Sequence, residues 1–151
     1  RNRRGGTEPV ELIVGFEQCV ALLTAERRDG YGATMRRLSD RLRDRLYALD
    51  GIHVVTPAHG ALPNIVSITF DDAATLDGEG VIVGMDLEGV AVSNGAACTS
   101  GSIQPSHVLS AMGLPDAQAK VAVRFSLSRY TTEDEIDGAV DALNKVLARM
   151  R

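Results

Sequence analysis

The chain has 151 residues, enough for about one domain with a substantial core. Its 44% hydrophobic and 24% charged residues are typical of a soluble globular protein, and no apolar run approaches the roughly 18 residues that cross a membrane. The net charge is −4, with six basic against twelve acidic residues in 51–151, which argues against a nucleic-acid-binding surface. Two cysteines in unlike surroundings predict no disulfide framework and a cytoplasmic location.

The first two predicted elements are helices. Thr7 is a suitable N-cap for the first, with Pro9 tolerated in its first turn. Cys19 falls on the apolar face of this helix, which we expect to be buried. A second apolar stripe runs from Met35 to Leu49 at intervals of three and four. The opposite face of this second helix is rich in Arg and Asp, which predicts a solvated surface with ion pairs one turn apart. The apolar face of the first helix consists of Leu12, Ile13, Phe16, Cys19, Val20 and Leu23.

Beyond Gly51 the apolar pattern changes to that of strands. The expected strands are 52–55, 65–70, 90–92 and 121–127. The segment 77–88 could be a strand or a helix. Its apolar triplet 81–83 favours a strand, whereas Asp77 could cap a helix. Gly80 and Gly84 would each cost such a helix about 1 kcal/mol relative to alanine.

A capping box of Thr132 and Glu135 marks the start of a last helix. Helices that alternate with strands in this way predict an α/β fold, namely a two-layer α/β sandwich. His53 and His59 have no ligand-like neighbours, so we interpret them as a strand residue and a loop residue. No metal site is predicted.

Cys98 lies in a run of small residues, 93–102, none of which is large enough to bury its thiol. Structural cysteines normally sit among large apolar residues, whereas a reachable and mobile thiol is what a sulfur nucleophile requires. Two glycines in the run let the backbone bend where other residues could not. Local composition alone leaves two readings open, a reactive thiol and an ordinary Gly/Ser loop that contains a cysteine.

Several motifs, taken together, point to one family. They are the segments 4–10, Leu62-Pro63-Asn64, 86–93, 95–101, 105–109 and 124–133. With these motifs the chain resembles the C-terminal part of the group I cysteine desulfurases, pyridoxal-phosphate (PLP) enzymes of the class V aminotransferase fold. The resemblance covers essentially all 151 residues and favours a helix over 77–88. Ser128 stands where the family usually has glycine, which puts the local turn in question.

The resemblance implies that residues 1–151 are the small C-terminal domain of a fold-type I PLP enzyme, with the start of the helix that leads into it. In the family, the lysine that binds the cofactor belongs to a large domain upstream. The only two lysines here, Lys120 and Lys145, match no such position. We therefore expect a fragment of roughly the last two-fifths of the enzyme, inactive alone and without bound PLP.

The resemblance also assigns roles in converting L-cysteine to L-alanine and a persulfide. Cys98 corresponds to the nucleophile, on a loop that swings between the cofactor and an acceptor. Arg124 corresponds to the residue that pairs with the substrate carboxylate, since a guanidinium can donate two parallel hydrogen bonds to it. Thr7 would bind the cofactor phosphate of the neighbouring subunit, which implies a homodimer. His107 is either a proton donor near Cys98 or a residue that caps or packs a short helix.

We expect the persulfide to pass to a sulfur-acceptor or scaffold protein, for iron–sulfur cluster assembly, tRNA thiolation or DNA phosphorothioation, with no direct contact to nucleic acid or membrane. Two alternatives stay open. One is a stand-alone sulfur-relay or interaction module that accepts sulfur on Cys98 without producing it. The other is an enzyme similar to selenocysteine lyase.

Overall fold

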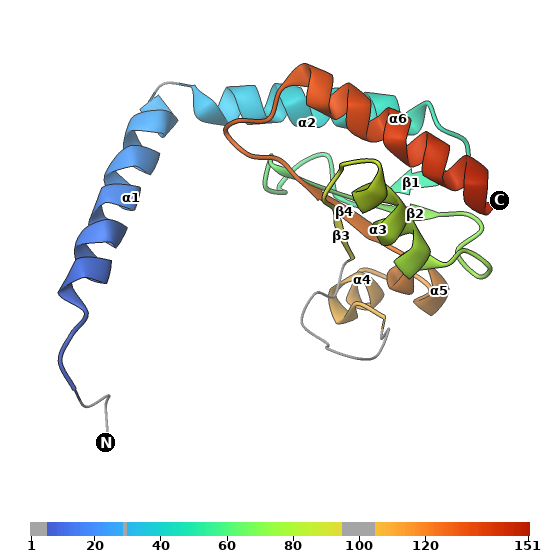
Figure 1. The fold of residues 1–151 in the computed structure, drawn as a ribbon, viewed down its shortest axis with the longest axis horizontal. Coiled ribbons are helices and arrows are strands. Elements are labelled where there is room, and N and C mark those ends of the chain that lie inside the picture. Colours follow the sequence, from blue (N-terminus) through green and yellow to red (C-terminus); the bar gives the residue numbers. More distant parts are fainter. Residues whose placement is uncertain (1–5, 29, 95–104) are drawn as a thin grey trace. The chain divides into compact units, whose positions relative to one another are not determined.

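A computed structural model of the chain describes residues 6–28, 30–94 and 105–151 (Figure 1). The chain divides into two compact units, Arg1–Thr34 and Met35–Arg151. None of the described helices is long and apolar enough to cross a membrane.

The first unit consists mainly of helix α1, Val10–Arg28. The helix begins immediately after Pro9, whose carbonyl oxygen accepts hydrogen bonds from the backbone N–H groups of Leu12 and Ile13, each at 3.1 Å. Proline suits this place because it has no N–H of its own to leave unpaired. The predicted N-cap role of Thr7 is therefore wrong: Thr7 lies three residues before the helix.

The apolar side chains of α1 are exposed, including Phe16 with 71% of its surface accessible. Cys19 is also exposed, so its predicted burial in a core is wrong for this structure. The first unit contains α1 and only the first turn of the next helix. Residues 6–28 and 30–34, the described part of this unit, offer no second layer against which the apolar face of α1 could be buried.

The second unit is built on a four-stranded antiparallel sheet with the order β1-β2-β4-β3. The strands are β1 Ile52–Val54, β2 Ile65–Phe70, β3 Ser93–Asn94 and β4 Val123–Ser126. The strand predicted at 90–92 is wrong in position. Instead, the backbone N–H of Val90 donates a hydrogen bond to the carbonyl oxygen of Met85, and the N–H of Gly89 donates one to the carbonyl oxygen of Asp86. These bonds form a Schellman motif that ends the preceding helix, with Gly89 at φ +82°.

Two helices, α2 (Tyr31–Tyr47) and α6 (Glu133–Met150), lie side by side on one face of the sheet (Figure 1). Within the second unit they bury the predicted apolar stripes against alternate residues of the central strands. This arrangement confirms the predicted α/β fold. The fully buried side chains of this core include Met35, Leu38, Leu42, Leu46, Val66, Ile68, Phe70, Val123 and Leu143.

Three arginines of α2 form ion pairs with three carboxylates of α6. Each pair is separated by 96 residues in the chain, so the two helices run parallel and remain in register for two turns. The predicted pairing within α2 is therefore replaced by pairing between helices. The pairs are Arg37–Glu133, Arg41–Asp137 and Arg45–Asp141.

The ambiguous segment is a helix, α3 (Gly78–Leu87), capped by Asp77, whose side chain accepts from the Glu79 N–H at 3.1 Å. Its Gly84 lies so close to α6 that a Cβ atom there would meet Val146 Cγ1 at 2.7 Å. The glycine lowers the helix propensity of α3, but it permits this close contact. The predicted capping box of α6 is present, with Thr132 accepting from the Glu135 N–H at 3.2 Å.

Two short helices, α4 (His107–Ala111) and α5 (Asp116–Lys120), complete the unit. Their small core contains Leu109, Ala119 and Ala122. Thr69 on β2 donates a hydrogen bond to the Gln118 carbonyl at 3.0 Å and so ties α5 to the sheet. These helices are too short to show a clear apolar period in the sequence.

Candidate substrate-binding site

Arg124 lies on β4 in the middle of the sheet, in register with Ser67 of β2 and Ser93 of β3. Its chain neighbours, Val123 and Phe125, are buried in the core beneath the helices. Because side chains alternate along a strand, Arg124 projects from the opposite face of the sheet. Strand alternation therefore places one half-buried cation on the face that α2 and α6 leave uncovered.

The Arg124 guanidinium makes one side-chain hydrogen bond among the described residues. Its Nη2 donates to the Ser93 hydroxyl at 3.0 Å. Its Nε is buried and has no partner in the described part of the chain. A buried donor without a partner is costly and rare, so this unpaired N–H is suited to an acceptor from outside the described residues. A carboxylate suits it, since both oxygens can accept from one guanidinium.

Cys98, the predicted nucleophile, belongs to residues 95–104, which lie outside the described residues. The expectation that its loop swings also falls there. What the structure describes is the strand that precedes it in the chain: β3 ends at Asn94, and its Ser93 contacts Arg124.

Thr7, the predicted phosphate ligand, is exposed and belongs to the unit Arg1–Thr34, whereas Arg124 belongs to the other unit. Because α1 starts only at Val10, the free N–H groups of its first turn begin beyond Thr7. The role of Thr7 in binding the cofactor stays a prediction.

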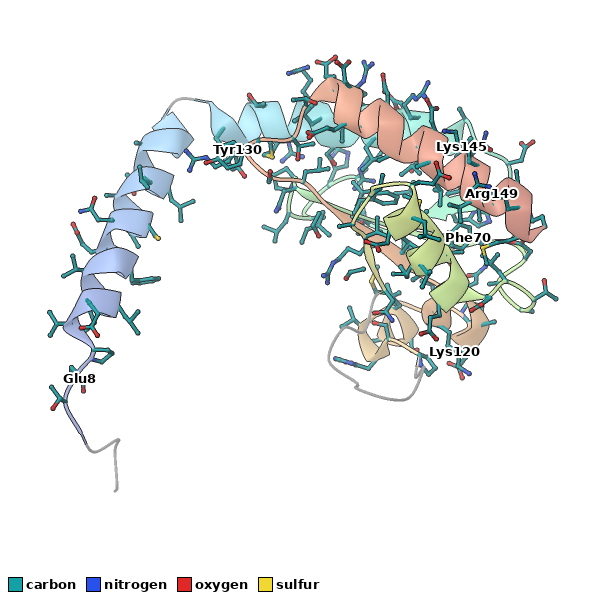
Figure 2. All side chains as sticks on the ribbon, in the orientation of Figure 1. Glu8, Phe70, Lys120, Tyr130, Lys145 and Arg149 are labelled. Atoms are coloured by element: carbon teal, nitrogen blue, oxygen red, sulfur yellow. The ribbon has the colours of Figure 1, made fainter. Side chains whose placement is uncertain are left out.

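Neither lysine has surroundings that suit PLP, which carries an anionic phosphate. Lys145 on α6 lies 3.7 Å from a Glu88 carboxylate oxygen, and Lys120 ends α5 (Figure 2). Lys120 lines a hollow of about 330 Å³, and Asp77 and Glu79, which carry carboxylates, line it as well. These carboxylates would repel a phosphate. The chemistry of Arg124 is suited to a carboxylate, whereas the described surroundings of the two lysines do not suit a covalently held PLP.

The three histidines have structural surroundings. His53 lies on β1 and contacts Asp71, His59 is in the following loop, and His107 is the first residue of α4. The predictions of a strand residue for His53 and a loop residue for His59 are confirmed. His107 is exposed and follows the N-cap Ser106, so it neither caps nor packs α4, and its role as a proton donor near Cys98 stays a prediction. Among residues 6–28, 30–94 and 105–151, no three metal-binding side chains come together.

The turn after β4 contains Ser128, where the resembled family usually has glycine, and serine is compatible with its backbone. No non-glycine residue described has a positive φ, so serine is unstrained there. Its backbone N–H donates to the Thr131 hydroxyl at 2.9 Å, and its own hydroxyl accepts from the Tyr130 N–H at 3.1 Å. The question that the sequence raised about this turn is answered, because serine stabilises it with side-chain hydrogen bonds.

A separate hollow of about 430 Å³ lies among residues of α2, β4 and α6, and Leu42, Phe125 and Ile136 help to line it. Arg124 is not part of this lining. The guanidinium and this hollow are therefore distinct features of the unit.

Comparison with known proteins places these features in a family. The model of the class-V aminotransferase family matches residues 1–138. The cysteine desulfurase IscS of Klebsiella pneumoniae is 38% identical over 151 residues, which are 100% of this chain and 36% of that protein. The chain thus spans about a third of the length of the curated relatives it matches.

Solved structures of similar proteins have the same fold as this chain. A NifS-like protein from Rickettsia africae superposes with a TM-score of 0.79 at 30% identity, covering 96% of this chain and 36% of that one. The cysteine desulfurase CsdA of Escherichia coli shares the fold, with a TM-score of 0.75 at 17% identity over 98% of this chain and 33% of its own. The family model, which covers most of the sequence, together with these likenesses shows that this chain belongs to the class-V aminotransferase family.

Proposed function

We propose that this chain is the substrate-binding and sulfur-accepting part of a PLP-dependent cysteine desulfurase, and that residues 1–151 form its small C-terminal domain. The observation that carries this proposal is the guanidinium of Arg124, held by Ser93 with a buried N–H left unpaired. The likeness to IscS over the whole chain supports the choice of L-cysteine among the amino acids that such a group could bind.

In this proposal Arg124 binds the substrate carboxylate. Its Nη2 is already held in place, so little side-chain entropy remains to be lost when the substrate binds. A charge-assisted hydrogen bond of this kind contributes about 1.5–3 kcal/mol, or roughly a tenfold to hundredfold effect on substrate binding.

Cys98 is the sulfur acceptor in this proposal. The thiolate attacks the sulfur of L-cysteine, an S–S bond forms, and the substrate's C–S bond breaks. The electron pair of that bond remains with the substrate's β-carbon, which takes up a proton, so the products are L-alanine and a Cys98 persulfide. PLP supplies the electron sink for such chemistry when bound. The persulfide then passes its outer sulfur to a separate acceptor or scaffold protein.

The remaining parts of the proposal concern the complete protein. It is a cytoplasmic homodimer in which Thr7 contributes a hydroxyl to the phosphate of the cofactor held by the neighbouring subunit. A hydroxyl is a suitable donor to phosphate oxygens, and the exposure of Thr7 leaves it accessible to another subunit.

The test uses the complete protein loaded with PLP and measures L-alanine formed from L-cysteine. Arg124→Ala should raise KM by about tenfold to hundredfold. Arg149→Ala is the matched control, because Arg149 is an exposed arginine of α6 that pairs with Glu88, and it should leave KM unchanged. Cys98→Ser should abolish persulfide formation while PLP binding stays normal.

The outcomes separate the competing functions. If the Arg124→Ala enzyme has the wild-type KM, Arg124 does not bind the substrate. A complete protein that accepts sulfane sulfur on Cys98 but makes no alanine would instead be a sulfur-relay module.

A further inference from the structure

The hydroxyl group of Ser93 makes two hydrogen bonds of different kinds. It accepts from Arg124 Nη2 at 3.0 Å and donates to the Asn94 carbonyl at 3.3 Å. A guanidinium can only donate, and a hydroxyl has a single hydrogen. The Asn94 carbonyl therefore takes that hydrogen, and the lone pairs of the Ser93 oxygen face Arg124.

Ser93 holds the guanidinium without cancelling its charge. Arg41 on α2 shows the contrasting case: the carboxylate of Asp137 holds it at 2.6 Å and compensates its charge. At Arg124 the acceptor is a neutral hydroxyl, and no carboxylate forms an ion pair with Arg124 in the described part of the chain. An oriented cation that stays uncompensated is what the binding of an anionic substrate group requires.

The pairing of β3 with β4 places Ser93 beside Arg124. Ser93 is one of only two residues in β3, and it is the register partner of Arg124 on β4. Ser67, the register partner on β2, has the same type of side chain and makes no side-chain hydrogen bond to Arg124 among the described residues. A serine in register with Arg124 is therefore not enough to make this contact: Ser93 makes it and Ser67 does not.

We propose that Ser93 is a positioning residue for substrate recognition: it orients the Arg124 guanidinium toward the substrate carboxylate and keeps its positive charge available. This inference rests on the proposed function, because it assumes that Arg124 binds the carboxylate of L-cysteine. Ser93 itself contacts the arginine and not the reacting atoms.

Steady-state kinetics of the complete PLP-loaded protein with L-cysteine test the inference. Ser93→Ala should raise KM by about 3- to 10-fold with kcat nearly unchanged, since one hydrogen bond to the arginine is lost. Ser93→Thr keeps the hydroxyl and should restore KM. Ser67→Ala is the matched control, in the same register row on the other neighbouring strand, and should leave both constants unchanged.

A second pair of variants separates charge from structure. Ser93→Asn and Ser93→Asp have nearly equal size, but only the aspartate places a negative charge against Arg124. We expect KM to be at least about tenfold higher for the aspartate variant, because its carboxylate competes with that of the substrate. Equal KM values for the two variants would overturn the inference.

The double variant tells which hypothesis fails. In an Arg124→Ala background, Ser93→Ala should have no further effect on KM, because the two residues act through one contact. If Arg124→Ala raises KM but Ser93→Ala does not, the role of Ser93 is overturned and the proposed function stands. If Arg124→Ala leaves KM unchanged, the proposed function itself fails.

Discussion

Replacing Gly84 with alanine tests how tightly α3 packs against α6. The new Cβ atom would lie 2.7 Å from Val146 Cγ1 and 3.1 Å from Cγ2, well inside the normal contact of about 3.5–4.0 Å between carbon atoms. Val146 is 2% exposed and β-branched, so it has essentially one rotamer in a helix and cannot turn away. Overpacking of this kind costs about 1–3 kcal/mol, against a gain of about 1 kcal/mol in helix propensity.

The matched control is Gly138→Ala on α6, because no heavy atom lies within 4 Å of a Cβ there. That variant should gain about 1 kcal/mol in unfolding free energy from propensity alone. Gly84→Ala should therefore be less stable than Gly138→Ala by about 1–3 kcal/mol in urea unfolding followed by circular dichroism. If the two variants agree within about 0.5 kcal/mol, the packing argument is refuted. In a Val146→Ala background the clash is removed, and Gly84→Ala should become stabilising.

Three further predictions concern stability and cofactor binding. The hydrogen bond from Arg41 lowers the pKa of Asp137. This pair should therefore stabilise the fold above about pH 4, and the stabilisation should be lost as the pH falls through the lowered pKa. Arg41→Met should make the loss of stability with falling pH less steep in that range, as measured by circular dichroism. Thr132→Ala removes the N-cap of α6 and should cost about 1 kcal/mol in urea unfolding, and a loss below about 0.3 kcal/mol would contradict the capping role. Residues 1–151 alone should show no visible PLP absorbance after reconstitution and dialysis and make no alanine; stoichiometric PLP retention would contradict the expectation of an inactive fragment.

The site was only partly predictable. The motif around Arg124 is continuous in sequence, so the resemblance identified the residue before any geometry was known. Its contact with Ser93, 31 residues away in the chain, depends on the register between β3 and β4. A serine that ends a run of apolar residues carries no signal that it will face an arginine. Register is a tertiary property, and only the paired strands reveal it.

The sequence by itself determined the features that depend on near neighbours in the chain. The strand at 65–70, the apolar stripe that starts at Met35 and the capping box at Thr132 all follow from local periodicity or local hydrogen bonds. The tertiary structure alone decided which faces are covered and which charges meet. The α1 stripe looks like a core face, but no layer covers it among the described residues of its unit, and the arginines of α2 pair with α6. Burial and ion pairing depend on the element that packs alongside, and that element is distant in sequence.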